Sequence, residues 1–281
     1  MRLVRTGADA GESDIAVEHR GRWVRLAHLP GWQDVIGLGG IIGPQRLREL
    51  AESVERFAGD LDPVTIDLGS AGTIAGQDAD IWGAGLNYRR HSEDLDSAQP
   101  ASGPGSYLRP AGCLVDNGGT IELPRQSGRV TAEAELGLVI GQECKNVARA
   151  DWRSVVTGVT AVLDMTAEDV IRENPRYIPW AKGFDTFCSI GPVLVTLDEF
   201  DDDTLRSLHI STVRNDETIA AATPADMKYD IGYLVEYFTA GRTLRAGTVI
   251  CTGTPGAAVI TAGDTVGAVV AQLGSLTHPV K

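Results

Sequence analysis

The chain has 281 residues, 43% of them apolar, which is enough for one large domain or two smaller ones with a sizeable core. A net charge of −13 without a Lys/Arg cluster argues against nucleic acid as a partner. No apolar run approaches the length of a membrane span, the N-terminus lacks a secretory signal, and the four cysteines form no C-x-x-C pair. We expect a cytoplasmic protein with a small-molecule substrate and without nucleic-acid or membrane partners.

The first third of the chain has the pattern of a small α/β unit. Residues 14–19 and 22–26 alternate in the manner of a β-hairpin. Residues 44–57 place apolar side chains at helical spacing behind a proline at the start, which predicts a helix. Gly, Ala and Ser then dominate residues 69–76, which favours a linker. The sequence therefore predicts a small N-terminal domain over residues 1–70.

The remaining residues, 78–281, are β-dominated and rich in turns. Helices are expected after Asp151, near Thr166 and over 231–240, each as a surface helix that covers a sheet. There is no βαβ rhythm, which argues against a Rossmann fold and favours an α+β domain. Strands are expected at 112–123, 130–141, 155–163, 193–197, 208–214, 248–251 and 265–272.

Glu133 and Glu135 lie two residues apart in the predicted strand 130–141. Side chains on a strand alternate between its faces, so both carboxylates point to one side. Two neighbouring carboxylates repel each other, and their burial is costly unless a cation neutralises them. A hard divalent cation with oxygen ligands fits that requirement. The alternative is a solvated strand face, which is the commoner explanation for this segment alone.

Asp164 and Lys182 supply two further candidate side chains. Asp164 follows the predicted strand 155–163, where it is equally well explained as a site carboxylate or as the N-cap of the next helix. Lys182 lies among aromatic residues and glycine, so it is either a partly buried oxyanion partner or proton carrier, or a surface lysine beside a turn.

Two more segments carry possible chemistry. His91 precedes Asp94 by three residues, with Glu93 between them, which suits either a general-base pair or a surface ion pair. Residues 252–254, Thr-Gly-Thr, follow the predicted strand 248–251. This turn could offer backbone N–H groups and hydroxyls to a carboxylate or oxyanion, or it could be an ordinary turn.

The order of these motifs resembles the fumarylacetoacetate hydrolase family over roughly residues 81–281. The shared series consists of Gly-Leu-Asn-Tyr-x-x-His at 85–91, Glu-x-Glu-Leu-x-x-Val-Ile-Gly at 133–141, Asp164, Lys-Gly-Phe-Asp-Thr-Phe at 182–187, and Thr-Leu-x-x-Gly-x-Val-Ile-x-Thr-Gly-Thr-Pro at 243–255. The resemblance implies a mixed β-sandwich roll, an α+β fold, and a homodimer.

The resemblance also implies a set of site residues. Glu133, Glu135 and Asp164 match positions that hold a divalent cation, with Mg²⁺ expected and Mn²⁺ or Ca²⁺ as alternatives. Lys182 would face a developing enolate. Substrate contacts are expected from Tyr88, Glu168, Thr252, Gly253 and Thr254, and water activation from His91 on a lid with Asp94 or Glu93.

The implied reaction is hydrolysis of a C–C bond in an acylpyruvate or 1,3-diketone through an enolate held by the metal. The same family hosts enolate chemistry without hydrolysis, namely tautomerisation or isomerisation, decarboxylation and dehydration. A non-catalytic binding protein that retains the fold is a third alternative.

The chain departs from the family pattern where substrate is expected. Glu168 and Ile171 replace the usual Arg and Gln, and the usual Phe-x-Lys-Pro reads Tyr-Leu-Arg-Pro at 107–110. An anion in place of a cation reverses the local field. Arg172 could replace the lost cation, but it directly follows Ile171, and adjacent residues on a helix point about 100° apart. We therefore expect a retained metal site with a less acidic or differently shaped substrate.

Overall fold

The computed structural model describes residues 1–6, 14–35, 37–40, 42–76, 79–89, 99 and 101–281. The predicted lid residues His91, Glu93 and Asp94 lie outside this described part of the chain. Among the described residues, no helix combines the length and the apolar character that a membrane crossing requires.

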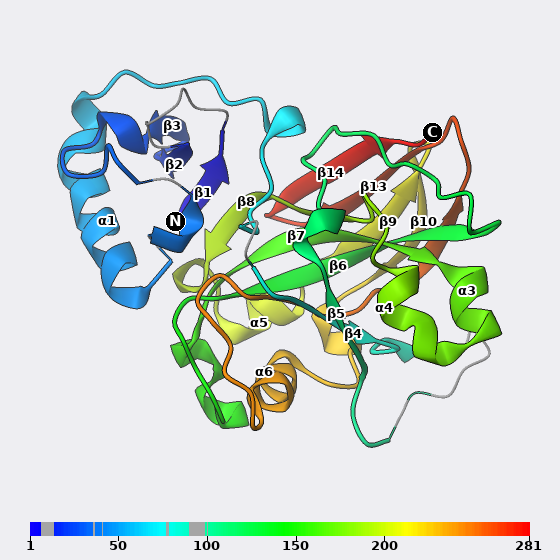
Figure 1. The fold of residues 1–281 in the computed structure, drawn as a ribbon. Coiled ribbons are helices and arrows are strands. Elements are labelled where there is room, and N and C mark those ends of the chain that lie inside the picture. Colours follow the sequence, from blue (N-terminus) through cyan, green and yellow to red (C-terminus); the bar gives the residue numbers. More distant parts are fainter. Residues whose placement is uncertain (7–13, 36, 41, 77–78, 90–98, 100) are drawn as a thin grey trace.

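The N-terminal residues form the predicted hairpin and helix. Strands β2 (Ile15–His19) and β3 (Arg22–Arg25) pair antiparallel, and α1 spans Pro44–Phe57. Proline suits the first turn of α1 because an N–H group at that position would have no partner within the helix. A further strand, β1 (Arg2–Arg5), pairs with β2 on one side and with β8 (Cys188–Thr196) on the other. Residues near the N-terminus therefore extend a sheet formed mainly by later residues (Figure 1).

That sheet is the larger of two. Its strand order is β3-β2-β1-β8-β7-β6-β11-β4-β5, and β12 also pairs with β6. All pairs are antiparallel except β11 with β4. The strands not yet delimited are β4 (Ile81–Gly85), β5 (Gly105–Arg109), β6 (Val130–Ile140), β7 (Val156–Ala167), β11 (Val249–Cys251) and β12 (Ala257–Ile260).

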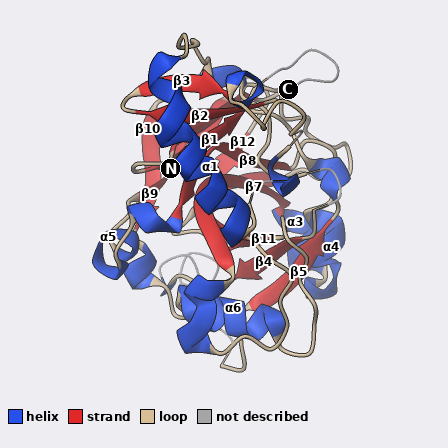
Figure 2. Cartoon of the chain, turned by 90° about the vertical axis from the view of Figure 1, so that its left-hand side faces the viewer, coloured by secondary structure: helices blue, strands red, loops and turns tan. Residues whose placement is uncertain are grey.

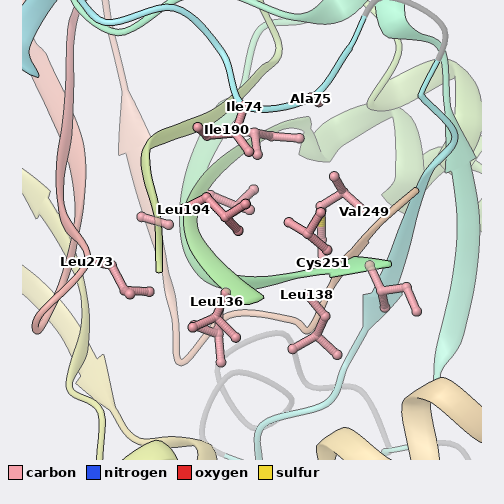
Figure 3. Packing of buried hydrophobic residues seen from close by; sticks show 14 of the residues in the cluster. Ile74, Ala75, Leu136, Leu138, Ile190, Leu194, Val249, Cys251 and Leu273 are labelled. Atoms are coloured by element: carbon pink, nitrogen blue, oxygen red, sulfur yellow. The ribbon is translucent and has the colours of Figure 1, made fainter. Parts of the chain in front are cut away.

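A second, four-stranded sheet has the order β10-β9-β13-β14, with β9 (Ile210–Arg214), β10 (Glu217–Ala222), β13 (Thr265–Val270) and β14 (Gly274–Pro279). Strands β9 and β13 pack against β6, and β14 packs against β7 and β8. Every residue of β6 is consequently buried. Figure 3 shows Leu136 and Leu138 of β6 in the core with Val249 and Cys251 of β11. The predicted β-dominated α+β class is confirmed, and two packed sheets form its core.

Helices lie around these sheets (Figure 2). The α-helices beyond α1 are α3 (Glu168–Glu173), α4 (Ile178–Ala181), α5 (Asp202–Arg206) and α6 (Ile231–Thr239). Helix α4 packs against α3 and β5. Short 3₁₀ helices are η1 (Leu26–His28), η2 (Leu38–Gly40), η3 (Ala58–Asp60), η4 (Leu68–Ser70), η5 (Ala111–Cys113), η6 (Arg149–Ser154), η7 (Pro175–Tyr177), η8 (Leu197–Glu199) and η9 (Pro224–Asp226).

Two sequence expectations were wrong. Residues 112–123 form no strand, only η5 and isolated bridges from Leu114 and Ile121, because Gly118 turns the chain with φ +80°. Asp164 is neither a strand terminus nor an N-cap, since β7 continues to Ala167, the N-cap of α3. Pairing with β6 continues to Ala167 and extends β7 beyond its apolar residues.

Candidate metal centre and substrate cavity

Pairing of β6 with β7 brings the three predicted carboxylates together. Glu133 is directly opposite Asp164 in this antiparallel pair, and Glu135 lies two residues further along the same face. One carboxylate oxygen from each residue lies within 4.8 Å of the others. Glu133 is 8% exposed, Glu135 2% and Asp164 0%, so the alternative of a solvated strand face is excluded. We call these residues the acidic triad.

Lys182, at the C-cap of α4, extends its ammonium group into the acidic triad. Its Nζ donates to Asp164 Oδ1 at 2.8 Å and to Glu133 Oε2 at 3.2 Å. A third bond, of 2.7 Å, goes to the hydroxyl of Thr166. The side chain is 8% exposed, which rules out the surface-lysine alternative.

Strand β5 adds two site residues that the sequence showed only as departures from a motif. The Arg109 guanidinium forms a buried ion pair with Asp164, and the Tyr107 hydroxyl donates to the other oxygen of the same carboxylate. Arg109 also donates to the carbonyl of Phe187 at 2.9 Å. The departure from the family motif at 107–110 was the only sequence signal for these two site residues. Nothing in the local sequence shows that 107–109 lies beside Asp164.

The turn after β11 holds Glu135. Strands β11 and β12 both pair with β6, and the turn between them passes Glu135, whose Oε2 accepts from Gly253 N at 2.8 Å. Gly253 has φ +94°, and a Cβ there would lie 2.7 Å from the Ala84 carbonyl oxygen. The hydroxyls of Thr252 and Thr254 each donate to a backbone carbonyl, at 2.9 and 3.0 Å. This conformation uses the turn chiefly to orient a carboxylate.

Burial and charge shift the acidities within the centre in opposite directions. Burial, followed by the nearby Asp164 charge, raises the pKa of Glu135 well above its usual range. Burial also acts to raise the pKa of Asp164, but the charges of Arg109 and Lys182 outweigh it and hold that pKa below its ordinary value. Burial opposes the charged form of Lys182, yet the Asp164 and Glu133 charges raise its pKa.

This donor set fits a hard divalent cation. Three buried carboxylates face two cations, Lys182 and Arg109, so one formal negative charge remains within the centre. Glu135 forms no ion pair with a cationic side chain in the described part of the chain. Burial and the Asp164 charge therefore raise its pKa, and the charge of Lys182 offsets them only in part. Clustered oxygen donors without nitrogen or sulfur suit Mg²⁺, Mn²⁺ or Ca²⁺.

A cavity of about 450 Å³ opens beside the acidic triad. That volume is typical of a small-molecule site. Glu133, Glu135 and Lys182 line one part of it, together with Tyr107, Gly253 and Thr254. Another part of the lining comes from α3, η7 and α4, through Glu168, Ile171, Arg172, Pro175 and Ile178.

Glu168 has an environment that the sequence did not indicate. Its Oε2 accepts from Arg129 Nε at 2.6 Å and its Oε1 accepts from Arg172 Nε at 2.7 Å. Arg172 lines the cavity, contrary to the expectation that it points away. The expected reversal of the local field is therefore corrected, because two guanidiniums outnumber the one carboxylate.

The structure separates the remaining predicted substrate residues. Gly253, Thr254 and Glu168 line the cavity beside the triad, whereas Thr252 is fully buried and is not part of the lining. Tyr88 is also buried and borders a different cavity, of about 1010 Å³, with Arg89 and Lys228.

Comparison with known proteins places this geometry in a family. The family model "Fumarylacetoacetate (FAA) hydrolase C-terminal" matches residues 80–281. Oxaloacetate tautomerase FAHD2 of Arabidopsis thaliana is 35% identical over 182 residues, 64% of this chain and 80% of the relative. A 2-hydroxyhepta-2,4-diene-1,7-dioate isomerase from Mycobacterium marinum is 33% identical, with a TM-score of 0.66 over 75% of this chain and 77% of its own.

A further solved structure matches the whole chain. Maleylpyruvate hydrolase from Sphingobium sp. SYK-6, crystallised with manganese(II) and pyruvate, is 28% identical, with a TM-score of 0.81 over 100% of this chain and 98% of its own. These relatives include a hydrolase, an isomerase and a tautomerase, so they share a family and differ in reaction. The chain belongs to the fumarylacetoacetate hydrolase family.

Proposed function

We propose that the protein is a divalent-cation-dependent hydrolase that cleaves a C–C bond in an acylpyruvate or a related 1,3-diketone. The observation that carries the proposal is the buried acidic triad with Lys182 Nζ beside it, at the wall of a cavity of about 450 Å³. We further propose Mg²⁺ as the resident cation, with Mn²⁺ able to replace it, in a cytoplasmic homodimer.

The residues of the centre suit stabilisation of an enolate. Glu133, Glu135 and Asp164 would hold the cation, which when bound supplies Lewis-acid polarisation of the substrate oxygens. Lys182 Nζ would stabilise negative charge that develops on the leaving enolate oxygen, because a buried cation acts strongly in a medium of low dielectric. Thr166 and Asp164 hold Nζ in place for this role.

Hydrolysis requires in addition a group that activates water. We assign this role to His91, supported by Asp94 or Glu93, on the basis of the sequence motif. Water adds to the ketone carbon, the C–C bond breaks, and the electron pair remains on the enolate, which is protonated to the 2-oxo acid. The acyl group leaves as a carboxylic acid.

The second candidate is enolate chemistry without hydrolysis. Similarity to a tautomerase at 35% identity and an isomerase at 33% identity supports it. Both reactions need a stabilised enolate, and only hydrolysis needs activated water. Replacement of the proposed base therefore separates the two.

The test is a proton NMR time course in D₂O with the Mg²⁺-loaded protein and either acetylpyruvate or oxaloacetate. We expect cleavage of acetylpyruvate to acetate and pyruvate. His91→Ala should abolish this cleavage and retain enolisation, seen as deuterium exchange. Hydrolysis at the wild-type rate by His91→Ala would refute the assigned base. Exchange or decarboxylation without any cleavage by the wild type would establish the second candidate.

A further inference from the structure

Glu168 and two arginines form a charged cluster at the part of the cavity lining contributed by α3. The Glu168 carboxylate is 9% exposed, and each of its oxygens accepts from a different guanidinium. Arg129 approaches from the residue before β6, and Arg172 approaches from one turn further along α3. Two positive charges on one carboxylate leave a net formal charge of +1.

Only one of the two arginines is in a position to meet a ligand. Arg172 lines the cavity, whereas Arg129 is not part of its lining. Arg172 directs Nε and Nη2 toward Glu168 Oε1, and its Nη1 makes no hydrogen bond within the part of the chain that the structure describes. Pairing of Arg129 with the other oxygen neutralises Glu168, so the charge of Arg172 is not cancelled.

The other part of the cavity also favours an anion once a divalent cation is present. The triad with Lys182 and Arg109 carries one formal negative charge, and a divalent cation changes its sign. Ile171, Pro175 and Ile178 supply apolar lining on the same part of the cavity as Arg172. The cavity therefore presents two cationic regions and an apolar lining to a single ligand.

We infer that Arg172 binds a second carboxylate, at the end of the substrate remote from the 2-oxo acid group, and that Glu168 is a positioning residue for Arg172. This inference rests on the proposed function and narrows its substrate class to dianionic acylpyruvates. Glu168 Oε1 accepts from Arg172 Nε and forms an ion pair with Nη2 of the same guanidinium, which limits the orientations of the guanidinium plane. The remaining N–H donors are available for a carboxylate.

The kinetic test compares two acylpyruvates that differ in one group. Fumarylpyruvate carries the distal carboxylate, and crotonylpyruvate has a methyl group in its place. Arg172→Met should lower kcat/KM for fumarylpyruvate by about 10- to 100-fold, mostly through KM, because one charge-assisted contact is lost. It should leave crotonylpyruvate nearly unaffected. Arg172→Lys should recover part of the loss in kcat/KM. The matched control is Arg176→Met, because Arg176 is an exposed arginine on η7 outside the cavity lining.

A binding test separates this inference from the proposed reaction. 2-Oxoadipate and 2-oxohexanoate lack the second ketone and cannot be cleaved, so calorimetric titration of the Mn²⁺-loaded protein measures affinity alone. If Arg172→Met weakens the binding of 2-oxoadipate but not of 2-oxohexanoate, the inference is supported even if no acylpyruvate is hydrolysed. Equal effects on both ligands, or none on either, would overturn it even if hydrolysis is found.

The role of Glu168 is tested by a double-mutant cycle. Glu168→Gln should raise KM for fumarylpyruvate less than Arg172→Met does. Because Glu168 acts through Arg172, the double variant should bind the dicarboxylate no more weakly than Arg172→Met alone. Additive losses would contradict a positioning role and indicate that Glu168 contacts the ligand itself.

Discussion

At the residue scale, the acidic triad shows how one arrangement can weaken the fold and create a site. Asp164 is compensated by Arg109, Lys182 and the Tyr107 hydroxyl. Glu135 receives only a backbone N–H, from Gly253, among the described residues. A buried carboxylate without a cation opposes folding, and a bound divalent cation removes that cost. The least compensated side chain is thus the one that a bound cation would stabilise most.

Glu135→Gln is therefore expected to separate stability from metal binding. Without metal, the variant should melt at or above the temperature of the wild type, because a neutral amide replaces a buried carboxyl group whose ionisation is unfavourable. Its Mn²⁺ affinity should fall by at least about tenfold, the lower limit for altering even an outer-shell partner. Melting curves in EDTA and calorimetric titration with Mn²⁺ measure both. Glu143→Gln, on an exposed carboxylate, is the control; a metal-free variant less stable than this control would refute the charge argument.

At the element scale, the pairing of β4 with β5 places a tyrosine ring across a glycine. Gly83 and Tyr107 are direct partners in this antiparallel pair, and a Cβ on Gly83 would lie 2.0 Å from Tyr107 Cζ. The ring can reach Asp164 only because no side chain occupies that space. The glycines of β4 weaken its strand pattern in the sequence. One of them, Gly83, is required by the site.

Gly83→Ala is expected to cost about 1–3 kcal/mol of unfolding free energy, the usual range for overpacking. The tyrosine ring must move, and its hydroxyl then loses Asp164. In a Tyr107→Ala background the same substitution should cost much less, because the collision is absent. Urea unfolding of the four proteins measures the cycle, with Gly112→Ala, where a Cβ meets no atom within 4 Å, as the control. An equal cost in both backgrounds would show that the ring is not the cause.

On β14, His278 is expected to make the stability of the fold depend on pH. Its side chain is buried, Nδ1 bonds to the Gly119 carbonyl at 2.8 Å, and Nε2 has no hydrogen-bond partner among the described residues. Burial lowers the pKa of His278 below its ordinary value of 6.5, although the Gly119 carbonyl acts in the opposite direction. Protonation would place a second, unpaired N–H in the core.

Because the pKa is lower in the folded than in the unfolded chain, the contribution of His278 to stability is complete above its unfolded pKa. It declines as pH falls toward the folded pKa, by up to about 1.4 kcal/mol per pH unit. Between pH 7 and pH 5, His278→Asn should therefore lose less unfolding free energy than the wild type in urea titrations. His209→Asn, on an exposed histidine, should follow the wild type. Parallel curves for all three proteins would contradict the assignment.

At the scale of the whole molecule, the division into residues 1–70 and 78–281 remains a prediction. Strand β1 lies between β2 and β8, with Leu3 opposite Leu194, so the first residues cover what would otherwise be an edge of the large sheet (Figure 1). The hydrophobic core continues from the N-terminal strands into β6, β7 and β8. A chain divided near residue 70 would expose both hydrophobic surface and unpaired backbone.

A fragment of residues 73–281 is expected to associate, because bare β8 offers unpaired N–H and C=O groups to another copy. Light scattering after size-exclusion chromatography, with the intact chain as reference, measures this. Adding a separately produced fragment of residues 1–72 should restore the assembly state of the intact chain. A fragment 73–281 that behaves like the intact chain would instead support an independent C-terminal domain.

The sequence alone determined several local elements and the candidate metal ligands. Helix 44–57 and the strand that carries Glu133 and Glu135 follow from periodicity, which depends only on neighbours in the chain. The order of motifs was enough for the family, which the comparisons confirmed.

The tertiary structure alone decided which cations meet these carboxylates. Arg109 reaches Asp164 across 55 residues, and Arg129 reaches Glu168 across 39. Such contacts depend on strand register and on the packing of α3, and neither leaves a local pattern in the sequence. For this reason the sequence showed Glu168 as an isolated anion, whereas the fold surrounds it with two arginines.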